Sequence, residues 1–71
     1  MTEMIDFALE GEYVELNQLL KLSGVCDSGG AGKALVADGQ VQVDGAVERR
    51  KTCKIRSGQQ VQCQGSTIRV C

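Results

Sequence analysis

The residues with the clearest chemical potential lie between Asp27 and Gly39, in the stretch DSGGAGKALVADG. Glycines surround Lys33 where a helical pattern begins, which is typical of loops that bind phosphate. The nucleotide-binding loop G-x-x-x-x-G-K-[ST] needs a glycine at its first position and a hydroxyl after the lysine. Those two positions hold Asp27 and Ala34, and no predicted strand leads into the stretch. The sequence therefore disfavours nucleotide hydrolysis.

A simpler phosphate site fits the same residues. If a helix starts at Ser28, Gly29 and Gly30 share the face of Lys33, because they precede it by four and three residues. Helical side chains lean toward the N-terminus, so the Lys33 ammonium can reach back over bare backbone, where free N–H groups and the helix dipole also attract anions. We predict that a nucleic-acid phosphate binds at Ser28, Gly29, Gly30 and Lys33. The alternative is that the two glycines simply belong to the preceding loop.

A basic segment follows this helix in the chain. Five of the eight basic residues fall within eight positions, namely Arg49, Arg50, Lys51, Lys54 and Arg56. Residues 1–15, by contrast, carry five acidic residues and no basic one. A basic cluster attracts polyanions, and the acidic leader keeps the domain near neutral. A solvated charged loop is the alternative interpretation of the cluster.

Composition excludes several classes of site. The chain has 71 residues, no histidine, no tryptophan, one tyrosine and one phenylalanine. This composition rules out a histidine-based triad, a histidine metal site and an aromatic platform for stacking bases. So short a domain buries only about 60% of the surface of its unfolded chain and leaves no room for a deep substrate cavity. We expect a binding surface without catalysis, cofactor or small-molecule substrate.

The four cysteines have no C-x-x-C spacing that would indicate a metal site. They are Cys26, Cys53, Cys63 and Cys71. Because the sequence shows no secretion leader and no apolar run of membrane-spanning length, we expect reduced thiols in a cytoplasmic protein. Cys53 and Cys63 alternate with Ile55 and Val61, which predicts small apolar side chains on the inner face of strands. Cys71 is the candidate for a redox-active thiol.

Hydrophobic periodicity predicts a single α+β domain over residues 1–71. A strand is expected at residues 4–9, helices at about 14–23 and 28–38, and a β meander over 40–71. Asp44-Gly45 is a strong signal for a two-residue hairpin turn. The meander's strands are expected to form a small antiparallel sheet.

Each predicted helix has an apolar face. The first helix carries a leucine stripe at Leu16, Leu19 and Leu20. The second helix is expected to bury Ala31, Ala34 and Leu35. Lys33 lies about 200° around the helix from Leu35 and should be exposed. Gly32 is interpreted as a point of close packing against the first helix.

The run from about Val14 to Val70 resembles the small RNA-binding domain named after ribosomal protein S-four, and within it the stand-alone, YbcJ-like bacterial branch. Several features carry the resemblance in order: a leucine-rich first helix, Ser-Gly-Gly-x-x-Lys at the second helix, Gly-x-Val-x-Val-Asp-Gly at the hairpin, Glu-x-Arg-x-x-x-Lys, and a closing Gly-x-x-Val. The resemblance implies two helices packed on a small antiparallel sheet, the αL motif. RNA would cross the start of the second helix and the following hairpin.

Site residues carried over by position agree with those suggested by the chemistry. Ser28, Gly29, Gly30 and Lys33 match the family's helix motif, Arg50 and Lys54 match basic positions after the hairpin, and Arg49 and Lys51 flank them. Two positions depart from the family pattern. Asp44 stands where many relatives have asparagine, which would place a negative charge beside the RNA, and Gly29 stands where larger members often carry arginine.

The resulting expectation is a monomeric, cytoplasmic, non-catalytic module that contacts the phosphate backbone of structured RNA, such as ribosomal or transfer RNA. The alternative is a protein-interaction adaptor whose acidic stretch, Glu3 to Glu15, docks on a ribosomal or other basic partner. An enzyme is the third class, and no nucleophile–base pair or carboxylate cluster supports it.

Overall fold

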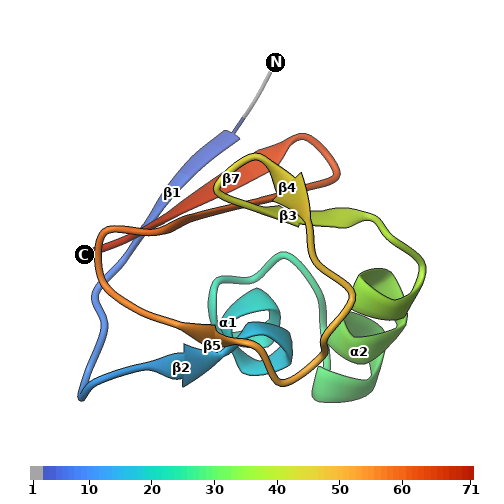
Figure 1. Cartoon of the computed structure of the whole chain (residues 1–71), viewed down its shortest axis with the longest axis horizontal. Helices are drawn as coiled ribbons and strands as arrows, with labels where there is room; N and C mark the ends of the chain where they lie inside the picture. The colour runs from blue at the N-terminus through green and yellow to red at the C-terminus, as the bar shows by residue number, and fades with distance from the viewer. Residues whose placement is uncertain (1–2) are drawn as a thin grey trace.

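The computed structural model describes residues 3–71 and shows two helices beneath a five-stranded sheet (Figure 1). The elements are β1 (Glu3–Phe7), β2 (Val14–Glu15), α1 (Leu16–Leu22), α2 (Gly29–Ala37), β3 (Val41–Val43), β4 (Ala46–Val47), β5 (Lys54–Ile55), β6 (Gln60–Cys63) and β7 (Ser66–Val70). The main sheet has the order β1-β7-β6-β3-β4, and β2 and β5 form a separate pair. The fold is therefore α+β. Neither helix is long and apolar enough to span a membrane, as judged over residues 3–71.

The antiparallel pairing expected for the meander is present, and the N-terminal strand β1 adds a parallel pair that makes the sheet mixed. β1 pairs with β7 in parallel, with Ile5 opposite Ile68, whereas β3, β4, β6 and β7 pair antiparallel. Parallel neighbours need a long crossover, and the whole of the intervening domain supplies it. Ile5 and Phe7 are half-buried, while Met4 and Asp6, which alternate with them along β1, are exposed.

The sequence predicted that the strand at residues 54–55 would belong to the meander. Strand β5 instead lies outside the main sheet. It pairs with β2, with Val14 opposite Ile55. The preceding residues explain this placement, because the carbonyls of Lys51 and Cys53 accept hydrogen bonds from the first turn of α1 and hold the chain beside that helix. The two remaining hairpins use two-residue turns. Asp44 has φ 51° and Gly45 φ 86°, the left-handed conformations that make the Asp-Gly turn favourable.

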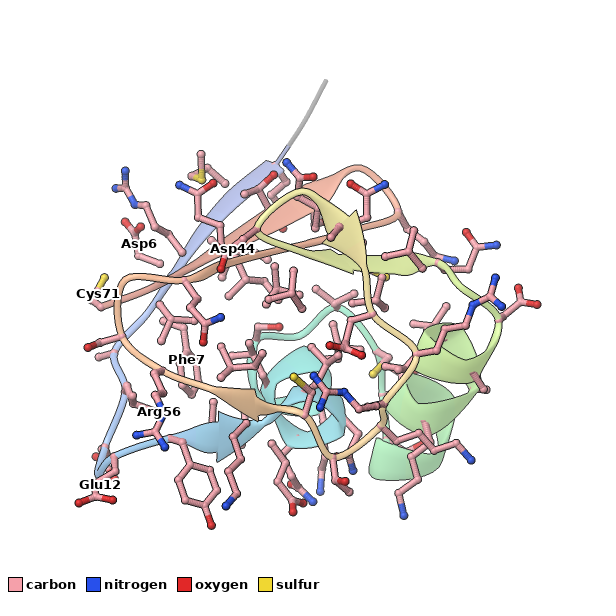
Figure 2. All side chains as sticks on the ribbon, in the orientation of Figure 1. Asp6, Phe7, Glu12, Asp44, Arg56 and Cys71 are labelled. Atoms are coloured by element: carbon pink, nitrogen blue, oxygen red, sulfur yellow. The ribbon has the colours of Figure 1, made fainter. Side chains whose placement is uncertain are left out.

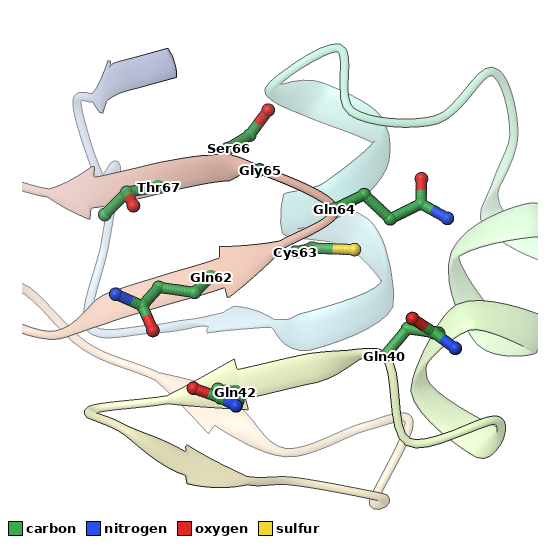
Figure 3. A pocket seen from close by; sticks show the side chains of 8 residues that line it. All are labelled: Gln40, Gln42, Gln62, Cys63, Gln64, Gly65, Ser66 and Thr67. Carbon is green, nitrogen blue, oxygen red and sulfur yellow. The ribbon is translucent and has the colours of Figure 1, made fainter. Parts of the chain in front are cut away.

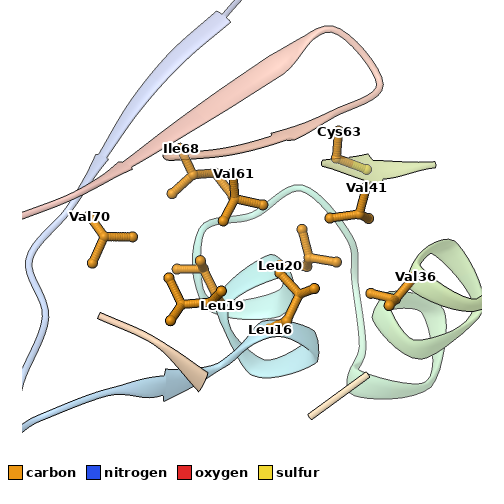
Figure 4. Packing of buried hydrophobic residues seen from close by; sticks show 10 residues of the cluster. Leu16, Leu19, Leu20, Val36, Val41, Val61, Cys63, Ile68 and Val70 are labelled. Carbon is orange, nitrogen blue, oxygen red and sulfur yellow. The ribbon is translucent and has the colours of Figure 1, made fainter. Parts of the chain in front are cut away.

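The core is entirely aliphatic apart from one cysteine (Figure 4). Its buried members are Leu16, Leu19, Leu20, Val36, Val41, Ile55, Val61, Cys63, Ile68 and Val70. The leucine stripe of α1 therefore lies where the sequence predicted. Cys63 is buried on β6, as predicted, whereas Cys53 is half-buried and lies just before β5 instead of on a strand. Burial also raises the pKa of both thiols, which lowers the fraction of reactive thiolate.

The inner face of α2 differs from the predicted one. Gly32 and Val36 are buried, whereas Ala31 and Ala34 are exposed and Leu35 is half-buried. A Cβ on Gly32 would lie 2.9 Å from the backbone oxygen of Asn17, so α2 approaches α1 through its smallest residue. The predicted face omitted both buried residues, Gly32 and Val36, and glycine adds no apolar side chain to the sequence pattern. The interpretation of Gly32 as a close-packing residue agrees with this contact.

Candidate nucleic-acid interface

Helix α2 begins with a side-chain cap that leaves its first amides open. Ser28 is the N-cap, and its Oγ accepts a hydrogen bond from the Ala31 N–H at 3.1 Å. The carbonyl of Ser28 accepts the N–H of Gly32 at 3.1 Å. Within residues 3–71, the N–H groups of Gly29 and Gly30 have no partner. Two donors at the positive end of α2 thus remain available to an anion.

The surface over these two glycines is open. A Cβ on Gly29 would meet no atom within 4 Å, and one on Gly30 would meet only the Ser28 Oγ, at 3.9 Å. Neither glycine has a positive φ, so neither backbone conformation demands glycine. Packing therefore does not explain the two residues. The bare backbone at both positions is open to close approach from solvent.

Lys33 is exposed one turn into α2. It lies four residues after Gly29 and next to the buried Gly32, so it stands at the edge of the helix face that meets α1. Asp27 lines a surface hollow together with Ala31 and Ala34, on the other flank of α2. The ammonium group and the bare glycine backbone consequently share one flank of the helix.

The basic segment, residues 49–54, caps the other helix. Glu15 precedes α1 without a side-chain cap. The Leu16 N–H instead donates to the Cys53 carbonyl at 2.9 Å, and the Asn17 N–H donates to the Lys51 carbonyl at 3.0 Å. Because these carbonyls point at α1, the side chains of Arg49, Arg50 and Lys51 are left exposed. The local fold thus fixes the backbone of the segment and directs its cations outward.

Asn17 joins the two parts of the site. Its N–H holds Lys51, while its carbonyl oxygen is the atom nearest the position of a Cβ on Gly32. The residues adjacent to these contacts are Arg50 and Lys33. In Figure 1 the yellow-orange segment between β4 and β5 runs down beside α2. The structure therefore places the start of α2 and the basic segment on adjoining surface, which we call the basic strip: Gly29, Gly30, Lys33, Arg49, Arg50 and Lys51.

Arg49 marks the far end of this strip. A Cβ on Gly39 would lie 3.2 Å from an Arg49 guanidinium nitrogen, so the side chain lies against the second residue after α2. A cation there interacts favourably with the negative end of the helix dipole. A nine-residue helix is about 13 Å long, which separates Arg49 from the glycines by roughly two phosphate spacings of a nucleic-acid strand.

Arg50 is partly committed to an internal ion pair. Its guanidinium binds both carboxylate oxygens of Glu48, at 3.1 and 3.0 Å, and its backbone N–H donates to the same side chain at 3.1 Å. The guanidinium and then the backbone N–H lower the pKa of Glu48 to about 2. The Arg50 side chain is still 77% exposed, so its remaining donors face solvent. Glu48 was missed as a site residue, although the Glu-x-Arg spacing is the signal that reveals it.

Lys54 lines one hollow together with Arg49, Arg50 and Lys51. Its ammonium also sits over the ring of Tyr13, 4.9 Å from the centroid, and its cross-strand neighbour is Glu15. We define the basic strip without Lys54 because its ammonium faces this ring, although the side chain lies beside the other cations.

Asp44 lies in the turn between β3 and β4 and not beside α2 (Figure 2). Its carboxylate accepts hydrogen bonds from the Gln59 side chain and the Gln60 N–H, at 3.1 and 3.0 Å. The Gln60 N–H, and after it the Gln59 amide, lower the pKa of this carboxyl. Figure 2 shows Asp44 on the side of the molecule away from α2. The negative charge is therefore remote from the basic strip.

A further hollow lies on the outer surface of the sheet (Figure 3). Its lining is amide-rich and consists of Gln40, Gln42, Gln62, Cys63, Gln64, Gly65, Ser66 and Thr67. Amide side chains can bind the edges of bases, but no lysine or arginine lines this hollow. It therefore lacks the charge needed to hold a phosphate backbone. No cluster of potential metal ligands occurs in the part of the chain described, residues 3–71.

A small α+β domain with an open, capped helix start beside a cation-bearing segment has the features of a nucleic-acid-binding fold. Residues 7–71 match the family model described as S4 domain, and the chain belongs to this family. It is 53% identical over 58 residues to YbcJ of Escherichia coli (strain K12), whose name presents RNA binding as a candidate function, with 82% of this chain and 83% of that protein covered. The same identity and coverage hold for YbcJ of Shigella flexneri.

A solved structure supports the fold independently. The solution structure of YbcJ from E. coli, described as revealing an αL motif involved in RNA-binding, matches with a TM-score of 0.74 and 49% identity. The match covers 99% of this chain and 90% of the other. The two helices against a sheet are thus those of the αL motif, as the resemblance implied.

Proposed function

We propose that this chain is a non-catalytic RNA-binding module that holds the phosphate backbone of structured RNA on the basic strip. The observation that supports the proposal is the double contact of Asn17, whose N–H donates to the Lys51 carbonyl and whose carbonyl oxygen lies against Gly32. One phosphate would bind the open N–H groups of Gly29 and Gly30 with Lys33 above them. Neighbouring phosphates would then meet Lys51, Arg50 and Arg49.

The mode of recognition follows from the side chains available. Phosphate contacts position a protein on RNA without reading sequence. The basic strip contains no aromatic side chain on which an unstacked base could lie. The module therefore reads the spacing and shape of the backbone, which suits a folded RNA such as ribosomal or transfer RNA. A cytoplasmic, monomeric protein is part of the same proposal.

Salt dependence tests this function. If Lys33, Arg49, Arg50 and Lys51 each neutralise one phosphate, the logarithm of the affinity should fall with that of the salt concentration with a slope of about −3 to −3.5. Fluorescence anisotropy with a labelled RNA hairpin at several salt concentrations measures the slope. A flat response, or equal affinity for an uncharged backbone analogue, would contradict phosphate binding.

Releasing Arg50 should strengthen the complex. Glu48→Gln removes a carboxylate from the edge of the basic strip and frees the guanidinium that binds it, so we expect RNA binding to become severalfold tighter. Asp6→Asn is the matched control, because it breaks the ion pair of Asp6 with Arg69, at 3.1 Å, by the same change of charge on another strand. An equal gain in both variants would show that only net charge matters.

A further inference from the structure

Both aromatic side chains of the chain line one surface hollow. It lies where the end of β1, the strand β2 and the last turn of α1 meet, and its lining includes Phe7, Leu9, Glu10, Tyr13, Val14 and Leu22. The chain has one phenylalanine and one tyrosine in total. The core, by contrast, contains no aromatic residue. We call this site the aromatic hollow.

The apolar surface here is exposed. Leu22 is 60% and Tyr13 41% exposed, although Phe7, Leu9 and Val14 pack partly against the core. Leu22 is the last residue of α1 and does not belong to its buried stripe. Exposed leucine and tyrosine beside a half-buried phenylalanine form the kind of patch that anchors a partner, since aromatic residues dominate the binding energy of interfaces.

Charge around the aromatic hollow identifies the kind of partner. Glu10 belongs to its lining, and Glu12 lies at the tip of the connection between β1 and β2 (Figure 2). Neither carboxylate forms an ion pair with any residue of the described range 3–71. Arg56, drawn beside Glu12 in Figure 2, makes no such contact with it. Lys54 is the one cation in contact with Tyr13, and Glu15 is its cross-strand neighbour.

Two occupants are conceivable, and the charges separate them. An RNA base could stack on Tyr13, but its phosphates would then lie beside Glu10 and Glu12, which repel them. A protein segment with lysine or arginine next to an aliphatic side chain meets no such repulsion. Its aliphatic side chain fits between Tyr13 and Leu22, and its cations lie near the two carboxylates.

We propose that the aromatic hollow is a docking site for a basic protein segment with an aliphatic anchor. This interaction is separate from RNA binding, because the hollow and the basic strip share no residue. The domain would thus hold RNA through α2 and a basic protein through the opposite end of α1, which locates the predicted adaptor role at defined side chains.

Tyrosine fluorescence gives a direct readout, because Tyr13 is the only tyrosine and the chain has no tryptophan. The probe is a displayed library of short random peptides built without tyrosine or tryptophan. Selection on the full chain should enrich peptides that carry net positive charge and a leucine, isoleucine or methionine. Titration of such a peptide should change the emission of Tyr13 saturably.

Matched variants locate the binding. Leu22→Ser should weaken it at least tenfold, and Glu12→Lys should weaken it severalfold, since both side chains are exposed and their removal leaves the core intact. Val47→Ser and Glu3→Lys, at exposed positions on other parts of the sheet, should change it less than twofold. Thermal melting checks that all four variants fold.

Three results would overturn the proposal. Selection could give no peptide above background, the selected peptides could bind Leu22→Ser as well as the original protein, or RNA affinity could fall tenfold in Leu22→Ser. The last result would assign the aromatic hollow to RNA. The first two results do not depend on whether the basic strip binds phosphate, so the two proposals fail separately.

Discussion

Lys33→Glu should lower the affinity for a structured RNA by about 10- to 100-fold while the domain remains folded. The variant loses a charge-assisted contact worth about 1.5–3 kcal/mol and adds a charge that repels phosphate. Each 1.4 kcal/mol corresponds to a tenfold change in affinity. Because Lys33 is exposed and takes part in no ion pair within residues 3–71, the substitution should leave the unfolding midpoint nearly unchanged.

Lys21→Glu is the matched control for this prediction. Lys21 is an exposed residue in the last turn of α1, outside the basic strip, and its reversal changes the net charge equally. Anisotropy titrations of both variants, with circular dichroism to monitor folding, separate a local contact from a general effect of charge. Equal losses in the two variants, or unfolding of Lys33→Glu, would contradict the position assigned to Lys33.

Alanine at Gly32 and at Gly30 should have opposite effects on stability. A Cβ on Gly32 would stand 2.9 Å from the Asn17 backbone oxygen, and backbone cannot rotate away as a side chain can. We expect Gly32→Ala to lower the free energy of unfolding by about 1–3 kcal/mol, because overpacking outweighs the better helix propensity of alanine. Gly30→Ala meets open space and should raise stability slightly, by at most about 1 kcal/mol.

RNA binding should follow a different order from stability in these two variants. Gly30→Ala puts a methyl group over the open amides, so affinity should fall severalfold in a protein that is no less stable. Gly32→Ala forces α2 away from Asn17 and so shifts Lys33 relative to Lys51. Urea denaturation and anisotropy together measure both quantities. A fully stable Gly32→Ala would show that α1 and α2 are not as closely packed as described.

Short-range patterns in the sequence were sufficient to predict several local features of the fold. The Ser28 cap, the glycines after it and the Asp44-Gly45 turn are specified by residues close together in the chain, and the structure contains each of them. The burial of the leucine stripe of α1 was also predicted correctly, because large apolar residues at helical spacing pack against the core.

Contacts between residues far apart in the chain were harder to predict from the sequence. The inner face of α2 was mispredicted because Gly32 makes its closest contact with α1. Having no side chain lets Gly32 approach the Asn17 backbone, and hydrophobic periodicity does not reveal such a contact. The pairing of β5 with β2 depends on carbonyls that cap α1, and backbone groups leave no mark in the sequence. The exposed position of Tyr13 was also unforeseen, since aromatic residues usually join the core.

Amide chemical shifts during an RNA titration test the central claim most directly. With ¹⁵N-labelled protein and a structured RNA, the account predicts that the largest changes occur at residues 28–33 and 49–51, together with Asn17 behind them. Changes confined to the amide-rich hollow on the sheet, or to β1 and the connection between β1 and β2, would contradict the basic strip as the RNA-binding surface.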